Sequence, residues 1–427
     1  MTDARASDRT TRSIRKRYAR ERRFRLYGMA ALLTAVGFLI LLLSSIAYQG
    51  HSAFLETQIR LDIDLDAEYI DPDGRRDPEV LRDGNYQALA RRALSALFPD
   101  VSSRSEKMAL YSLISSGTGL RLRDEVLADP SLLGTTREVW VLADDDADSY
   151  FKGFIDPDVP EDDRRLTDLE IGWLDSLRDR GDARVVFNTT FFTSGDSREP
   201  EQAGIRSAAK GSYLTLIVTL LLSFPLGVLA AVYLEEFAPE NRLSQLIEVN
   251  INNLAAVPSI IFGLLGLAVL LNFFGLPRSA PLVGGMVLAL MTLPTIIIAA
   301  RAALKAVPPS IREAALGIGA SQIQVVTHHV LPLAMPGILT GTIIGMARAL
   351  GETAPLLMIG MVAFIVDVPA GFTEPATVLP VQVFIWSDSP ERAFVAKTAA
   401  ATMVLLTFLI AMNAAAVGLR RRFERKW

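Results

Sequence analysis

The sequence predicts an all-α polytopic membrane protein of six transmembrane helices, with an α+β extracytoplasmic domain inserted between helices 1 and 2. Half of the 427 residues are apolar although 21% are charged, so the two kinds of residue must be segregated along the chain. Several apolar stretches also reach the roughly 20 residues that a helix needs to cross the hydrocarbon core of a membrane, which is about 30 Å thick.

Six apolar stretches supply the predicted spans. They are residues 26–48, 212–234, 254–276, 280–300, about 337–366 and 398–419. The first is longer than the apolar part of a typical signal peptide, and no A-x-A-like cleavage site follows it closely, which favours a retained anchor. The fifth carries two charges inside it, Arg348 and Glu352.

Basic flanks predict the orientation. Residues 1–25 hold ten basic residues, and five more follow the last span: Arg420, Arg421, Arg422, Arg425 and Lys426. Six spans place both ends on one side of the membrane, and basic flanks favour the cytoplasm. We therefore expect a multi-pass protein of the cell inner membrane with cytoplasmic N- and C-termini.

The acidic segment 49–205 is the predicted extracytoplasmic domain. It holds 33 acidic and 18 basic residues, a net charge of about −15, which leaves about +11 on the rest of the chain. Its patterns predict strands at 60–69, 138–142 and 184–192 and helices at 85–98 and 167–180. The expected domains are thus a basic N-terminus (1–25), helix 1 (26–48), this domain (49–205) and a membrane region (206–427) that includes a loop at 308–336.

Neither a metal site nor a nucleic-acid partner is expected. The Asp62–Asp66 run lacks the glycine and glutamate of a calcium loop, and it is typical of a solvated strand face. The acidic cluster beginning at Asp144 is typical of a solvated helix start. His328 and His329 are adjacent, so on a helix they point about 100° apart, and the chain has no cysteine.

The loop between spans four and five is expected in the cytoplasm, because its basic residues include Lys305 and Arg312. Ser310 is the predicted N-cap of a short helix over residues 310–318. Glu313 would lie in the first turn, where the helix dipole favours a carboxylate. Pro332 and Pro336 are expected to stop the segment that follows.

The spacing of a Glu-Ala-Ala motif in this loop resembles the coupling loop of the MetI-like ABC importer permeases. The matching residues are Glu313, Ala314, Ala315, Gly319, Leu331 and Pro332, whereas His329 stands where the family usually has isoleucine. The resemblance implies docking on an ATPase subunit. The chain has no Gly-Lys dipeptide and so no Walker A loop, which places ATP and Mg²⁺ on the partner and makes this chain a transport subunit without a cofactor of its own.

Arg348 and Glu352 are the candidate substrate residues. Arg348 is eleven residues from Gly337, or roughly 17 Å at about 1.5 Å per residue, near the middle of the membrane. An arginine there costs about 2.5–3.5 kcal/mol, and its planar fork suits oxyanions. Gly351 and Pro355 interrupt the helix, as in many transport sites. A structural interpretation also stays open, in which the two charges neutralise each other and hold the helices together, and the two interpretations are compatible.

Three stretches resemble the phosphate-uptake permeases known as PstA: 348–357, 253–263 and 225–234. The resemblance covers about residues 204–427 and makes that region an importer permease domain. It implies inorganic phosphate as the solute, a homologous PstC-like permease, a PstB-like ATPase dimer and a periplasmic PstS-like phosphate-binding protein. Arg301 either joins the phosphate route or reaches the cytoplasmic interface. The acidic domain departs from the family, and the sequence assigns it no task.

Other classes of function fit less well. One arginine does not select phosphate over sulfate, molybdate or phosphonate, so a permease for another oxyanion stays open. A membrane-anchored sensor would need a cytoplasmic output domain, and the sequence shows none. An intramembrane enzyme would need a nucleophile with its base, or metal ligands, within the spans.

Overall fold

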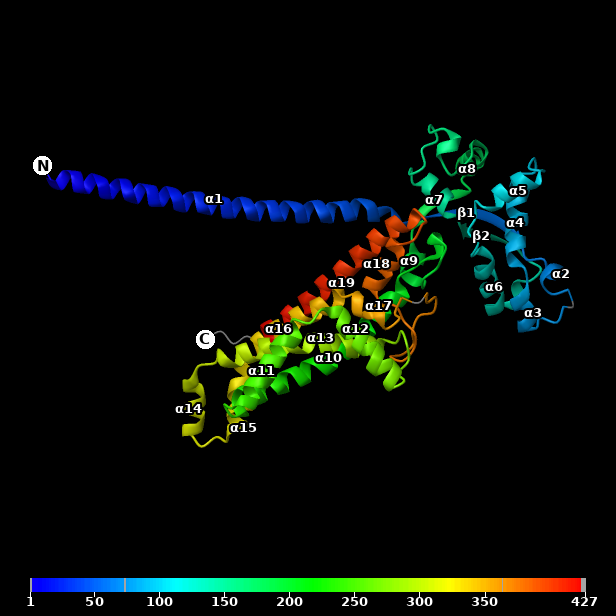
Figure 1. The fold of residues 1–427 in the computed structure, drawn as a ribbon. Helices are drawn as coiled ribbons and strands as arrows, with labels where there is room; N and C mark the ends of the chain where they lie inside the picture. The colour runs from blue at the N-terminus through cyan, green and yellow to red at the C-terminus, as the bar shows by residue number, and fades with distance from the viewer. Residues whose placement is uncertain (1, 73, 363, 424–427) are drawn as a thin grey trace. The chain divides into compact units, whose positions relative to one another are not determined.

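The computed structural model describes residues 2–72, 74–362 and 364–423, and most of them are helical (Figure 1). Arg425 and Lys426, counted above in the basic C-terminal flank, lie outside these residues. The chain divides into two compact units, one up to Gln49 and one from Gly50 onward. The first consists of the long helix α1 (Thr2–Gly50), which contains no proline and includes the first predicted span.

The inserted domain, residues 51–205, contains a three-stranded antiparallel sheet in the order β2-β1-β3. The strands are β1 (Leu55–Asp64), β2 (Thr136–Leu142) and β3 (Ala183–Phe187). Along β1, Ile59, Leu61 and Ile63 are buried in the core, while Asp62 and Asp64 are exposed. The alternation of apolar and acidic residues therefore has the cause that the sequence predicted, a strand with one solvated face.

Eight α-helices complete the inserted domain. They are α2 (Ala67–Ile70), α3 (Pro78–Asp83), α4 (Tyr86–Leu97), α5 (Arg104–Tyr111), α6 (Thr118–Ala128), α7 (Asp145–Phe151), α8 (Asp168–Arg180) and α9 (Thr189–Thr193). The helices predicted at 85–98 and 167–180 are confirmed as α4 and α8. Thr167 and Glu170 form a capping box at the start of α8, and Gly181 ends it at φ 74°.

Two predicted strands extend too far. The strand predicted to reach residue 69 ends at Asp64, because the Asp66 side chain accepts from the amide of Glu68 and starts α2. The strand predicted to reach residue 192 ends at Phe187, because the Asn188 side chain caps α9. Short polar side chains that bond to nearby amides compete with strand pairing in this way.

The membrane region contains ten α-helices, three of which continue into, or follow, π-helical turns. They are α10 (Arg206–Val232, continued by Tyr233–Phe237), α11 (Arg242–Ala255), α12 (Ser259–Leu265, continued by Gly266–Phe273), α13 (Pro281–Lys305), α14 (Pro309–Gly317), α15 (Gln322–Gln324), α16 (Leu331–Gly351, preceded by Val325–Val330), α17 (Ala354–Met358), α18 (Leu379–Ser387) and α19 (Ala393–Phe423). Among the described residues, five helices are long and apolar enough to cross a membrane, or up to six if one bent pair counts as a span.

That bent pair corrects the third predicted span. Instead of one straight helix over 254–276, α11 and the α12 segment meet at an angle of 103°. Pro258 follows the bend and caps α12, and the residue before a proline is disfavoured in helical conformation. The fifth predicted span is displaced towards the N-terminus, because the helix runs from Gln322 to Gly351 and not over 337–366.

Candidate translocation site and coupling loop

Helices α13 and α16 pack antiparallel through small residues, which fixes the level of Arg348. A Cβ on Gly337 would lie 2.6 Å from the Cβ of Ala303, and one on Gly341 would lie 2.1 Å from the Cβ of Ala299. Real Cβ atoms do not approach so closely, so these positions require glycine. From the first contact to the second, the position moves four residues forward along α16, from Gly337 to Gly341, and four residues backward along α13, from Ala303 to Ala299.

Extending this register places Arg348 level with the residues around Thr292. Thr292 lies near the midpoint of α13, which runs from Pro281 to Lys305. At about 1.5 Å per residue, Arg348 is roughly 18 Å from either end of α13. The structure thus places this arginine at the mid-level of the helical bundle, as the residue count predicts.

Arg348 and Glu352 come together at a break in the helix. The Nε atom of Arg348 donates to Oε1 of Glu352 over 3.4 Å, and 50% of the arginine side chain is exposed, against 19% of the glutamate. α16 ends at Gly351, Glu352 has extended backbone (ψ 123°), and α17 begins at Ala354. This hydrogen bond uses Nε of Arg348, and half of the side chain is exposed, so the guanidinium can also meet an anion.

A second irregular segment lies against this break. A Cβ on Gly263 of α12 would lie 2.6 Å from the Cα of Pro355, so the two backbones are in close contact. The helix that follows the bend, α12, and the helix that follows the break, α17, therefore pack directly against each other. Broken helices that meet at mid-membrane supply backbone polar groups to solute sites.

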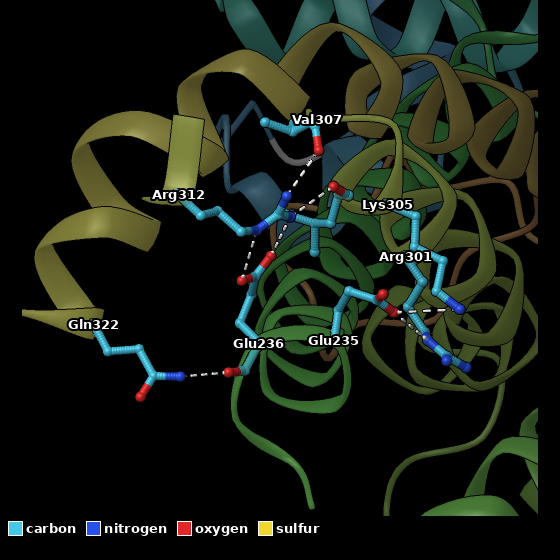
Figure 2. Close-up of polar contacts among 8 residues, drawn as sticks. Glu235, Glu236, Arg301, Lys305, Val307, Arg312 and Gln322 are labelled. Atoms are coloured by element: carbon cyan, nitrogen blue, oxygen red, sulfur yellow. Dashed lines mark hydrogen bonds and ion pairs between the residues drawn. The ribbon is translucent and has the colours of Figure 1, made fainter. Parts of the chain in front are cut away.

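Arg301 lies elsewhere, near the end of α13 that leads into α14. Its guanidinium pairs with Glu248 at 3.0 Å and with Glu235 at 3.4 Å, and 15% of the side chain is exposed (Figure 2 shows the Glu235 contact). The structure does not bring Arg301 together with Arg348. Among the predicted site residues, these two arginines therefore have different surroundings.

The predicted short helix of the coupling loop is present as α14, with two changes of detail. It begins one residue earlier, with Pro308 at the N-cap, so Ser310 lies inside the helix and does not cap it. Glu313 is beyond the first turn, so the argument from the helix dipole fails. Proline is favoured at the first helical position, which Pro309 occupies.

The other predicted coupling residues lie on both sides of a turn. Glu313 and Ala314 are exposed, whereas Ala315 is buried. Gly319 has φ 88°, a conformation that side chains other than glycine rarely adopt. Pro332 does not stop the segment as predicted: Leu331 and Pro332 are the first residues of α16, and the π-helical turn Val325–Val330 runs directly into them, so the helix is continuous from Gln322 to Gly351. Pro336 lies inside the same helix.

Sequence reasoning missed two features of this loop. Leu316, Ile318 and Ile323 are exposed, with 83% of Ile318 accessible, so the loop presents apolar side chains as well as the motif. The second feature is the acidic pair Glu235 and Glu236 at the end of α10, which holds the basic residues nearby (Figure 2). Its signal in the sequence is two carboxylates directly after an apolar stretch.

In the inserted domain, the acidic start of α7 is less solvated than predicted. Asp144 caps α7, and burial, followed by the charges of Asp145 and Glu201, raises the pKa of Asp144 to about 8. Carboxylate oxygens of Asp144, Asp145 and Asp146 lie within 4.8 Å of one another. Arg165 pairs with Asp146 at 3.3 Å and balances part of this charge. Helix α7 packs against β1, α19 and the turn at Pro200–Gln202, and this packing partly removes the cluster from water.

Residues 223–426 match the family described as "Binding-protein-dependent transport system inner membrane component", and residues 11–161 match a domain of unknown function, DUF3333. The probable ABC transporter permease protein YqgI of Bacillus subtilis is 34% identical over 168 residues, which are 39% of this chain and 56% of that protein. The phosphate transport system permease protein PstA 1 of Mycobacterium tuberculosis is 31% identical over 223 residues, which are 52% of this chain and 72% of that protein.

Among solved structures, the inward-facing MetNI methionine ABC transporter aligns with 52% of this chain and 96% of its own, at 18% identity and a TM-score of 0.40. The apolar helical bundle and the matched family define an inner membrane component of a transport system. The chain belongs to the PstA-like family of ABC transporter permeases.

Proposed function

We propose that this chain is one permease subunit of an ATP-driven ABC importer that carries inorganic phosphate across the inner membrane. The likeness to PstA 1, named as a phosphate transport system permease, supports the choice of solute. The structural observation that carries the proposal is the half-exposed Arg348 beside Glu352, at a helix break level with the middle of α13.

The chemistry of this pair suits transient phosphate binding. Arginine stays protonated at any physiological pH, and its fork can donate two parallel hydrogen bonds to phosphate oxygens. Glu352 neutralises Arg348 when no solute is present and repels an anion that arrives. A site in a transport path must bind strongly enough to admit the solute and weakly enough to release it. Competition between Glu352 and phosphate for one guanidinium meets both requirements.

The partners follow from the same proposal. A PstB-like ATPase dimer supplies ATP hydrolysis and receives the coupling loop, whose exposed Leu316 and Ile318 provide an apolar contact. A PstC-like permease completes the path, and a PstS-like binding protein delivers phosphate from outside. The basic flanks support cytoplasmic termini, which places the inserted domain on the outer side.

Two measurements on cells test the proposal. Deleting the chain should abolish high-affinity uptake of radiolabelled phosphate, and a tagged chain solubilised in mild detergent should retain an ATPase and a second permease. Unchanged phosphate uptake would contradict the proposal. Sulfate, molybdate and phosphonate serve as competitors: if one of them blocks phosphate uptake at equal concentration, the solute is that wider class of oxyanion.

A further inference from the structure

An ion pair connects the coupling helix to the end of the second span. Glu236 lies in the π-helical turn that continues α10, and Arg312 lies in α14. Nη2 of Arg312 donates to Oε1 of Glu236 at 2.7 Å, and Nε donates to Oε2 at 3.2 Å (Figure 2). Both carboxylate oxygens are therefore held by one guanidinium, the geometry that fixes orientation as well as distance.

The same arginine also holds the end of α13. Its Nη1 donates to the carbonyl of Val307 at 2.7 Å, and its Nη2 donates to the carbonyl of Leu304 at 3.0 Å. The Leu304 carbonyl also accepts from the backbone N–H of Val307 at 3.2 Å, so Arg312 adds a second donor to a turn that is already hydrogen-bonded. One side chain thus joins the ends of α10 and α13 to α14.

Gln322 adds a second connection on the far side of the loop. Its Nε2 donates to the backbone carbonyl of Glu236 at 2.6 Å (Figure 2). Arg312, which precedes the Glu-Ala-Ala motif, therefore binds the side chain of Glu236. Gln322, which follows Gly319, binds its backbone. Both halves of the coupling loop converge on this one residue.

The pair is shielded from water, unlike its neighbour. Side-chain exposure is 9% for Glu236 and 23% for Arg312, whereas Lys305, which lies 3.7 Å from Glu235, is 59% exposed. Exposed ion pairs contribute little, but a shielded, doubly hydrogen-bonded pair resists separation. Ala231 of α10, Leu304 of α13 and Ala315 of α14 belong to one buried apolar cluster, so the three elements that the pair joins also share a core.

We propose that Glu236 and Arg312 are positioning residues that transmit a displacement of α14 into α10 and α13. The inference rests on the proposed function, because the displacement comes from the ATPase. α14 is joined to the chain by short non-helical segments around Pro308 and Gly319, which would absorb a push if nothing braced the helix. The ion pair between Glu236 and Arg312 restrains α14 relative to the ends of α10 and α13. α10 and α13 pack against α16, so the movement reaches the helix that carries Arg348.

The experiment compares variants of the full transporter in proteoliposomes, with the wild type as reference. Phosphate uptake and ATP hydrolysis are measured together, so that each variant yields a ratio of ATP hydrolysed to phosphate carried. Glu236→Gln and Arg312→Lys should retain the ATPase subunits on purification, hydrolyse ATP, and raise the ratio at least about tenfold. Arg312→Lys keeps the charge but cannot hold both carboxylate oxygens and both carbonyls.

Lys305→Gln is the matched control, since it removes an exposed basic residue from the same cluster and should leave the ratio unchanged. An unchanged ratio in Glu236→Gln and Arg312→Lys would overturn the inference. Loss of the ATPase subunits or of the folded chain in both variants would also overturn it, because the pair would then serve stability alone. If the wild-type transporter carries no phosphate, it is the proposed function that fails.

Discussion

The membrane region and the inserted domain treat charge in opposite ways. The inserted domain carries most of its charges at the surface, as in the pair of Arg121 and Glu125, where both side chains are more than a third exposed. In the membrane region, Arg348 lies level with the middle of α13 and has a carboxylate partner, Glu352. A charged side chain in water costs little free energy, so its presence gives little information about function. A charged side chain within a bilayer needs a partner to offset its cost, and its presence therefore indicates a functional role.

The largest effect is expected at Arg348. Arg348→Gln should lower phosphate uptake at least about 100-fold, since losing about 3 kcal/mol of charge-assisted hydrogen bonding corresponds to two factors of ten. Uptake of radiolabelled phosphate into cells measures it, with co-purification of partner subunits as the check on assembly. Arg242→Gln, at the start of α11, is the control and should transport normally. Normal uptake by Arg348→Gln would make the pair structural and erase the contrast between the two regions.

The next effect is expected at Gly319. Gly319→Val forces a β-branched residue into φ 88°, which costs on the order of 1–2 kcal/mol, and should reduce ATP-coupled uptake about tenfold. ATPase retained on the purified chain and phosphate uptake are the two readouts. Gly317→Ala is the matched control, because it lies two residues away, has space for a Cβ and lacks the positive φ. Equal coupling in both variants would show that the turn is not needed for docking.

A smaller effect is expected at Arg301. Arg301→Gln leaves Glu235 and Glu248 without their partner and should destabilise the chain by about 1–2 kcal/mol, a value reduced from that of a fully buried pair because Glu248 is half exposed. Thermal unfolding in detergent measures this loss. Phosphate uptake by the double variant Arg301→Gln, Glu235→Gln then separates the two interpretations of this residue. Restored uptake assigns Arg301 to the end of the bundle, and persistent loss assigns it to the phosphate route.

The smallest effect is expected in the inserted domain. Burial raises the pKa of Asp144 to about 8, above an unfolded value of about 3.9, so the folded state binds the extra proton between these limits. Asp144 therefore contributes its full share to the free energy of unfolding below about pH 4. This contribution falls as the pH rises towards 8, by at most about 1.4 kcal/mol per pH unit. Hydrogen exchange of residues 136–151 in the full chain should quicken over this range. In Asp144→Asn, exchange should quicken with pH only as much as the intrinsic exchange rate does. If the variant and the wild type show the same pH profile, Asp144 does not titrate between about pH 4 and 8.

Much of the membrane region could be predicted because the length of an apolar stretch is itself the physical constraint. The stretches 212–234 and 398–419 lie within α10 with its π-helical continuation and within α19, and the stretch 280–300 lies in α13 together with its N-cap, Ala280. The bend before α12 was missed because the polar residues of α11 hid a helix that precedes the apolar run. The prolines after the coupling loop were misjudged because membrane helices tolerate proline, and Pro332 and Pro336 both lie within the continuous helix Gln322–Gly351.

The candidate site was predictable only in part, for a related reason. Arg348 and Glu352 stand out because charge is rare within an apolar stretch. Glu236 does not stand out, since two acidic residues after a span look like a solvated loop until Arg312 is brought beside them by the fold. The sequence therefore reveals a charge such as Arg348 that lies within an apolar stretch. It does not reveal that Glu236 pairs with Arg312, because the two residues are 76 positions apart and only the fold brings them together.

The central claim is that residue 348 faces an aqueous path at the middle of the membrane. The chain has no cysteine, so Arg348→Cys introduces a single thiol into an otherwise unreactive protein. Its modification by a membrane-impermeant methanethiosulfonate is measured in sealed vesicles, with and without ATP. The account predicts modification from an aqueous side, at a rate that changes when ATP is bound. A thiol that reacts only after detergent is added, with or without ATP, would contradict it.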